Sequence, residues 1–258
     1  MSSAPATSIA AARAELAPTG VLRAGLNFSN FLITKRDPAT GAIGGVAADL
    51  AHEIGRRLGV PVAFVGYETP GQMADAAQSG VWDIAFLGAE PLRAQQIAFS
   101  AAYLEIEATY LVPAGSKVQS VDEVDRAGMR ISVSNKSAYE LYLTRSLKHA
   151  ELIKIDGADA SFDVFVAENM DALAGLRPRL VTEAEKLPGS RVLAGRFTAI
   201  QQAIGTARNG ADGTARSGAG AAYLRTFVEE AKAGGLVARA LAANGVRGAT
   251  VAPPAPPA

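Results

Sequence analysis

Short apolar runs alternate with amphipathic stretches along most of this chain. The run 21–26 (VLRAGL) has the pattern of a strand, and the stretch 46–59 repeats apolar residues at helical spacing before a terminal glycine. A second strand at 60–65, a helix at 73–80 and a third strand at 83–88 follow. The order strand–helix–strand–helix–strand predicts a parallel sheet wrapped by helices.

A second series begins after Val112-Pro113. We expect a short capped helix at 120–123, a strand at 129–133, a helix over 137–149, a strand at 153–155, a helix around 163–170, a strand at 171–176 and a returning segment at 191–203. Two more helices are expected within 221–245, broken at Gly234-Gly235. The pattern predicts an α/β fold of two Rossmann-like lobes, with a hinge and a cleft between the lobes.

The predicted domain limits follow from these two series. They are an N-terminal extension at 1–19, a first lobe at 20–108 and 204–246, a second lobe at 109–203, and a disordered Pro/Ala-rich tail at 247–258. With two complete lobes, the protein is expected to be a monomer.

Composition narrows the function. A chain of 258 residues with a hydrophobic fraction of 49% is expected to fold, and 25 basic residues against 25 acidic ones give no basic excess for nucleic acid. No run reaches the roughly 20 apolar residues of a membrane span. Without cysteine, and with only His52 and His149, which both look solvated, neither a metal site nor another cofactor is expected.

The first twenty residues lack the charged start and continuous apolar core of a secretory signal. Either a mature protein begins behind a new Met, or the protein is cytosolic.

The stretch 82–103 (WDIAFLGAEPLRAQQIAFSAAY) carries the clearest chemistry. Its apolar run ends in Gly88, and Arg93 follows shortly before Phe99-Ser100. A guanidinium at the carboxyl end of a strand suits a small anion in an open α/β sheet. The alternative is a surface arginine at a helix start.

These motifs, in this order, resemble the extracellular solute-binding proteins of ABC importers, family 3, with the type II periplasmic-binding fold typical of polar amino-acid binders. The resemblance covers roughly 20–245. It is carried by LRAGLN, GAIGGVAADLAHEIGRRLGV, WDIAFLGAEPLRAQQIAFSAAY, RISVSNKSAYELYL and MDALAGLRP. It implies capture of a small carboxylate-bearing solute, an amino acid or related organic acid, by lobe closure. It also implies a periplasmic location and a membrane permease as partner.

In the first lobe, the resemblance implies that Arg93 clamps the ligand carboxylate, helped by backbone N–H groups of Gly88 and Ala89. Glu90 stands where the family has a hydroxyl-rich turn.

At the end of the first strand, Asn27 takes the place of a family acid, within a polar cluster that extends to Asn30. Phe28 or Phe31 would stack over the ligand, although either ring could belong to the core instead.

In the second lobe, Asn135, Ser137 and Ala138 correspond to a turn that grips the carboxylate at a helix N-terminus. Lys136 replaces a glycine there and is expected to face solvent.

Leu176 stands where amino-acid binders place an Asp for the ligand amine, and it cannot pair with an ammonium. The next residue, Arg177, would suit a second anionic group, or else pair with Glu183 or Glu185. Together, Asn27 and Leu176 disfavour a basic amino acid.

Two other functions stay open. Relatives of these binders include dehydratases of the cyclohexadienyl or arogenate type, in which Glu90 or Glu140 would donate a proton. A ligand-sensing module is weaker, because the chain carries no motif that would transmit a signal.

Overall fold

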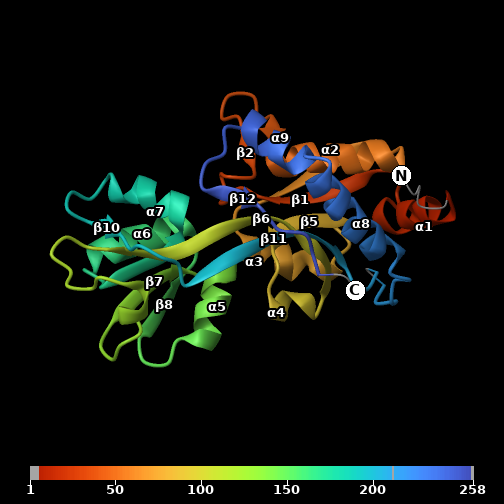
Figure 1. Cartoon of the computed structure of the whole chain (residues 1–258). Coiled ribbons are helices and arrows are strands. Elements are labelled where there is room, and N and C mark those ends of the chain that lie inside the picture. Colours follow the sequence, from red (N-terminus) through yellow and green to blue (C-terminus); the bar gives the residue numbers. More distant parts are fainter. Residues whose placement is uncertain (1–5, 211, 257–258) are drawn as a thin grey trace. The chain divides into compact units, whose positions relative to one another are not determined.

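The computed structural model describes residues 6–210 and 212–256 (Figure 1). The chain divides into two compact units: unit 1 comprises 1–105 and 201–258, and unit 2 comprises 106–200. The chain passes between them within strands β6 (Ile97–Val112) and β11 (Thr198–Ala207). The predicted crossings, after 108 and 203, lie three residues further along. The α/β class predicted from the sequence is confirmed.

The sheet of unit 1 contains the three strands of the first predicted series. Its order is β4 (Val62–Tyr67), β1 (Leu22–Asn27), β5 (Ile84–Gly88), β11 and β6. Strand β1 runs parallel to both β4 and β5, whereas β11 runs antiparallel to β5. The carboxyl ends of β1 and β5 therefore lie at the same edge of the sheet.

Helix α2 (Val46–Leu58) forms where the apolar spacing predicts it. Val46, Leu50, Ile54 and Leu58 are all buried. Gly59 ends the helix with φ 67°, a left-handed conformation that glycine adopts without strain. The other helices of unit 1 are α1 (Ala6–Leu16), α3 (Pro70–Asp75), α4 (Pro91–Ala94), α8 (Ala219–Ala233) and α9 (Leu236–Ala243), with a 3₁₀ turn at Ala76–Gln78.

Both terminal segments contain regular secondary structure within the residues that the structure describes. Within the N-terminal extension, α1 packs on α8, with Leu16 buried close to Gly220. The prediction of a disordered tail from 247 is wrong for 249–252, because β12 (Ala249–Val251) pairs with β6 and the N–H of Ala252 donates to the Tyr103 carbonyl at 3.2 Å. Residues 257–258 of that tail lie outside the described part.

Unit 2 also combines parallel strands with helices around a hydrophobic core of its own. Its strand order is β6, β9 (Ala172–Leu176), β7 (Arg130–Ser134) and β8 (Glu151–Ile155), and β10 (Arg191–Val192) also pairs with β6. Strand β7 is parallel to both β8 and β9. The helices are α5 (Ala138–Ser146), α6 (Ala158–Ala167) and α7 (Arg177–Ala184), with a 3₁₀ turn at Val121–Glu123. Tyr110, Ile131, Val133 and Leu143 lie in its core.

Among the described residues, none of the helices combines the length and apolarity that crossing a membrane requires.

Glu53 on α2 provides a pH-dependent contribution to the stability of unit 1. Hydrogen bonds from Arg56, and then from Arg57, lower the pKa of Glu53 from 4.5 to about 2. A carboxyl group whose pKa is lower in the folded protein stabilises the fold at every pH above its unfolded pKa. This stabilisation is lost as the pH falls through the pKa of the folded state. Arg57 also pairs with Glu230 at 2.7 Å, which links α2 to α8.

We therefore expect Glu53→Gln to lower the melting temperature at neutral pH. The difference from the wild type should shrink as pH falls from 4.5 towards 2. Thermal unfolding followed by circular dichroism across this pH range measures it. A difference independent of pH would contradict the assigned role of the carboxylate.

Candidate functional site

The turn after β1 carries four of the candidate residues. The Asn27 side-chain oxygen accepts hydrogen bonds from the Ser29 N–H at 3.1 Å and from its hydroxyl at 2.8 Å. The Phe28 N–H donates to the Tyr67 carbonyl at 2.9 Å. Asn27 thus shapes the turn through a local side-chain-to-backbone bond, a role that its amide fulfils without a charge.

Asn30 and Thr34 bring unsatisfied polar atoms into the same turn. Asn30 is 6% exposed and Thr34 is 2% exposed. Among the described residues, Asn30 Oδ1 and Thr34 Oγ1 are buried atoms without a hydrogen-bond partner. A buried polar group left unpaired costs about 1–3 kcal/mol, and such groups often await a ligand or water. The sequence predicted Asn30 but missed Thr34.

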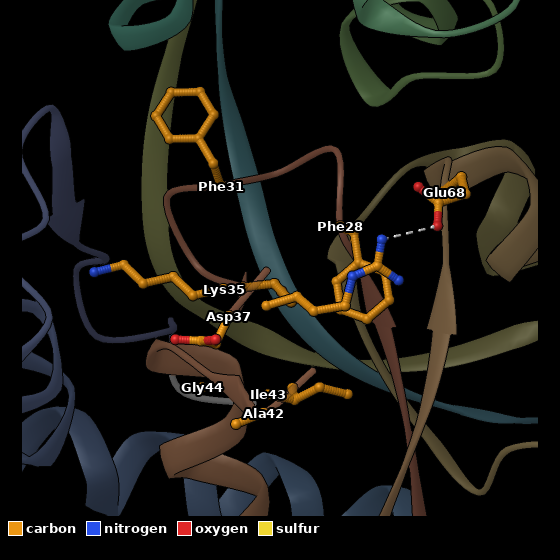
Figure 2. A pocket seen from close by; sticks show the side chains of 10 residues that line it. Phe28, Phe31, Lys35, Asp37, Ala42, Ile43, Gly44 and Glu68 are labelled. Atoms are coloured by element: carbon orange, nitrogen blue, oxygen red, sulfur yellow. Dashed lines mark ion pairs between the residues drawn. The ribbon is translucent and has the colours of Figure 1, made fainter. Parts of the chain in front are cut away.

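Phe28 lines an open pocket of about 740 Å³ in unit 1 (Figure 2). The lining residues are Phe28, Phe31, Thr34, Lys35, Arg36, Asp37, Ala42, Ile43, Gly44 and Glu68. Most come from the segment around the hairpin of β2 (Lys35–Arg36) and β3 (Ile43–Gly44). Phe31 is 45% exposed, and its ring points away from that of Phe28 (Figure 2). Phe28 is half-buried and Phe31 is exposed, so neither residue belongs to the buried core.

The position of the Phe28 ring depends on Gly66 in β4. A Cβ at Gly66 would lie 2.2 Å from Cε2 of Phe28 and 2.7 Å from its Cζ. These separations are far below van der Waals contact, so the ring fits against the strand only because residue 66 has no side chain.

The turn after β5 holds Arg93, at the predicted carboxyl end of the strand. Arg93 is only 6% exposed, and its Nη1 donates to the Gly88 carbonyl at 2.8 Å. Glu90 precedes α4 as its N-cap and is also buried. A guanidinium held in a buried position is pre-oriented for a bidentate pair with a carboxylate.

The backbone around Arg93 departs from one expectation. The N–H of Ala89, expected to face a ligand carboxylate, donates to the Gln201 carbonyl at 2.8 Å. Its N–H is therefore already bonded within unit 1, and Ala89 stays a predicted ligand contact only because it directly follows β5.

Gln202 on β11 is a neighbour that the sequence did not reveal. It lies opposite Gly88 in the antiparallel register and is 4% exposed. Its Oε1 is another buried atom without a partner among the described residues. This acceptor lies beside the end of β5, where the arginine turn begins.

In unit 2, the turn between β7 and α5 is fixed by a reciprocal pair of hydrogen bonds. Ser137 is the N-cap, and its hydroxyl accepts from the Glu140 N–H at 3.0 Å. The Glu140 carboxylate in turn accepts from the Lys136 N–H at 3.1 Å, while Lys136 has a φ of 53°. This arrangement satisfies the exposed N–H groups of the helix start.

The flanking residues of this turn are also held in place. Asn135 donates from its side-chain amide to Asp156 at 2.8 Å, and Ala138 is 7% exposed at the first position of α5. The backbone N–H of Lys136 holds this residue in the turn through its bond to Glu140, and the residue as a whole is exposed.

Arg177 begins α7, after the end of β9. Its Nε donates to Glu107 at 2.6 Å, its Nη1 to the Leu193 carbonyl at 3.1 Å, and its Nη2 to the Gly195 carbonyl. The expected pairing with Glu183 or Glu185 is wrong, because Glu107 is the partner. Arg177 is therefore engaged within unit 2 itself, and its role toward a second anion stays a prediction.

Strand order brings the candidate residues together within each unit. Parallel pairing of β1 with β5 places the Asn27–Phe31 turn and the Gly88–Arg93 turn at one sheet edge. Parallel pairing of β7 with β9 does the same for the Ser137 turn and Arg177. Carboxyl ends of parallel strands are where open α/β sheets bind ligands.

No group of three acidic, histidine or cysteine side chains among the described residues could hold a metal ion. His52 and His149 are exposed, as their patterns suggested.

Comparison with protein families now identifies the chain. The model for bacterial extracellular solute-binding proteins, family 3, matches residues 32–239. The chain belongs to this family. No curated protein matches the sequence.

Solved structures of several binding proteins share the fold at low sequence identity. The P235GK mutant of ArgBP from T. maritima is 18% identical with a TM-score of 0.73, and the match covers 92% of this chain and 100% of that one. A solute receptor for L-cysteine of Neisseria gonorrhoeae is 20% identical with a TM-score of 0.71, covering 92% of both chains. An ancestral amino-acid-binding protein, described as a precursor of cyclohexadienyl dehydratase, is 21% identical with a TM-score of 0.70, covering 90% and 98%. The fold is therefore the two-lobed periplasmic-binding type.

The contact between Gly66 and Phe28 can be tested by substitution. Gly66→Ala should displace the Phe28 ring and reduce the free energy of unfolding by about 1–3 kcal/mol, the usual cost of overpacking. Gly44→Ala is the matched control, because a Cβ there would meet nothing within 4 Å. Urea unfolding should show the control within about 0.5 kcal/mol of wild type. Equal effects of the two substitutions would contradict the assigned contact.

Proposed function

We propose that this family-3 protein is the solute-binding component of an ABC importer. It captures a small carboxylate-bearing solute, an amino acid or related organic acid, and passes it to a membrane permease. It acts in the periplasm or at the cell exterior, as a monomer. Lobe closure over the solute, expected from the sequence, is part of this proposal.

The observation that carries the proposal is the buried guanidinium of Arg93 at the carboxyl end of β5. A cation in such a position favours an anionic guest, since a charge-assisted bidentate pair is about twice as strong as a neutral hydrogen bond. Asn30 and Gln202 add buried acceptors in the same unit that a ligand's donors could satisfy. Of the structural relatives named above, one is a solute receptor for L-cysteine and another is an ancestral amino-acid-binding protein, and both support an amino-acid ligand.

Arg93 should therefore dominate the affinity. We expect Arg93→Ala to weaken binding at least about tenfold, equivalent to about 1.4 kcal/mol. Arg93→Lys should recover part of the loss, because an ammonium keeps the charge without the planar fork. The ligand is first found by a thermal-shift screen of amino acids, dicarboxylates and aromatic acids, and affinities are then measured by calorimetry.

His52→Ala and Arg56→Ala serve as controls on α2, since both side chains are exposed. Neither should change the affinity. If removing the Arg93 guanidinium left it unchanged as well, the carboxylate clamp would be refuted.

Catalysis on the same fold is the alternative that the sequence left open. Of its two candidate proton donors, Glu140 is 2% exposed, and its carboxylate contacts the Lys154 ammonium at 2.7 Å and the Thr144 hydroxyl at 2.5 Å. With the Lys136 N–H as a third donor, the carboxylate acts as an acceptor that organises its turn. These contacts favour a structural role for Glu140 over proton donation by this residue.

We accordingly expect no turnover of prephenate or arogenate by the purified protein. Absorbance of the aromatic product over several hours measures this directly, with a known dehydratase as positive control. Product formation that Glu90→Gln abolishes would overturn the transport proposal.

A further inference from the structure

The hairpin of β2 and β3 presents a cation to the aromatic ring in the pocket of unit 1. The guanidinium carbon of Arg36 lies 4.4 Å from the centroid of the Phe28 ring. This is within the distance at which a cation is attracted to an aromatic face. Arg36 also pairs with Glu68, Nη2 to Oε1 at 3.6 Å, the contact dashed in Figure 2. One side chain thus covers an aromatic face and approaches a carboxylate at the same time.

The Phe28 ring packs against strand β4. Its edge lies so close to the backbone of Gly66 that a Cβ there would clash. The backbone N–H of Phe28 is bonded to the Tyr67 carbonyl, which holds the backbone of the residue beside the same strand. The ring is therefore backed by β4 on one side, and Arg36 lies on the face that the ring offers to the pocket.

The acidic groups that line the pocket are also engaged. The Asp37 carboxylate accepts hydrogen bonds from the N–H groups of Ala39 at 2.9 Å and Thr40 at 2.8 Å, within its own turn. Glu68 is the acid that pairs with Arg36. A basic ligand side chain entering this pocket would meet a covered aromatic face and a carboxylate already facing a cation.

We propose that Arg36 is a specificity-determining residue that excludes solutes with a basic side chain. It occupies the Phe28 face and neutralises Glu68, so that the pocket accepts neutral or acidic side chains. This rests on the proposed function and deepens it by naming the class of solute. A basic ligand must either displace Arg36, losing its two contacts, or approach a like charge.

The size of the effect follows from the exposure of the pair. Arg36 and Glu68 have side chains 50% and 69% exposed. Exposed ion pairs and exposed cation–π contacts are individually weak, so the discrimination should be about five- to tenfold rather than absolute. This discrimination adds to the effect of Asn27 and Leu176, neither of which offers a carboxylate to a basic ligand.

The test compares Arg36→Gln with wild type by calorimetry, using L-arginine and L-glutamine as probes in low-salt buffer. We expect Arg36→Gln to bind L-arginine about five- to tenfold more tightly than wild type, while L-glutamine changes by less than about twofold. Arg36→Glu should increase L-arginine affinity further, because it adds a second carboxylate beside Glu68. Arg56→Gln, an exposed arginine on α2, is the matched control and should change neither affinity.

Two results would overturn the inference. One is an unchanged L-arginine affinity in both Arg36 variants whose circular-dichroism spectra match wild type. The other is an equal increase in affinity for L-arginine and L-glutamine, which would mean that Arg36 blocks the pocket sterically and does not discriminate by charge. If Arg93→Ala still abolishes binding of the screened ligand, only the inference fails. If neither wild type nor Arg36→Gln binds any amino acid or organic acid, the proposed function fails with it.

Discussion

Parallel pairing of neighbouring strands determines where the candidate ligand contacts of this chain can lie. In unit 1, β1 and β5 run side by side in the same direction, so the turns that follow them emerge at one edge of the sheet. In unit 2, β7 and β9 impose the same constraint on the Ser137 turn and Arg177. Helix caps and side-chain bonds then set the direction of each turn, as with Asn27 and with the Ser137–Glu140 pair. Position comes from the sheet, and orientation comes from local hydrogen bonds.

The parts of the fold and of the candidate site that could be predicted are those that depend on local sequence patterns. The strand runs, the α2 helix and the Gly234-Gly235 break depend on residues close in sequence, and the structure has all of them. Arg93 was found because a strand, a breaker and a cation follow one another within one short motif. Gln202 and Thr34 could not be found this way. Gln202 matters because β11 returns to lie against Gly88, and Arg177 meets a glutamate 70 residues earlier in the chain. Such partners are chosen by topology, which spacing along the sequence does not encode.

The two terminal segments also show that tertiary contacts can determine structure where local sequence patterns do not. The sequence predicted only an extension at the N-terminus, and the Pro- and Ala-rich composition of residues 247–258 predicted a disordered tail. In the structure, Leu16 of α1 is fully buried near Gly220, and the carboxylate of Glu15 accepts from the Gly220 N–H at 2.7 Å. A carboxylate at the start of α8 stabilises its unpaired N–H groups and its dipole. At the other end, β12 gains order by joining β6. Composition indicates whether an isolated segment would be ordered. Packing against α8 or pairing with β6 adds stabilising contacts that composition does not reveal.

The distribution of charge in unit 1 bears on which end of a ligand would be recognised most strongly. Arg93 places a buried cation after β5, and the buried Glu90 carboxylate lies three residues before it. The other buried acceptors near the strand ends are neutral: Asn30 Oδ1, Thr34 Oγ1 and Gln202 Oε1. A carboxylate would therefore meet the Arg93 guanidinium, while an ammonium would meet these neutral acceptors and the Glu90 carboxylate. Hydrogen bonds with one ionised partner are stronger than neutral ones, but an ammonium without a counter-carboxylate still pays more desolvation than a paired one. Asn27 and Leu176, at positions where the family resemblance implies acids, and the contact of Arg36 with the Phe28 ring support the proposal that the ligand is recognised chiefly by its anionic end.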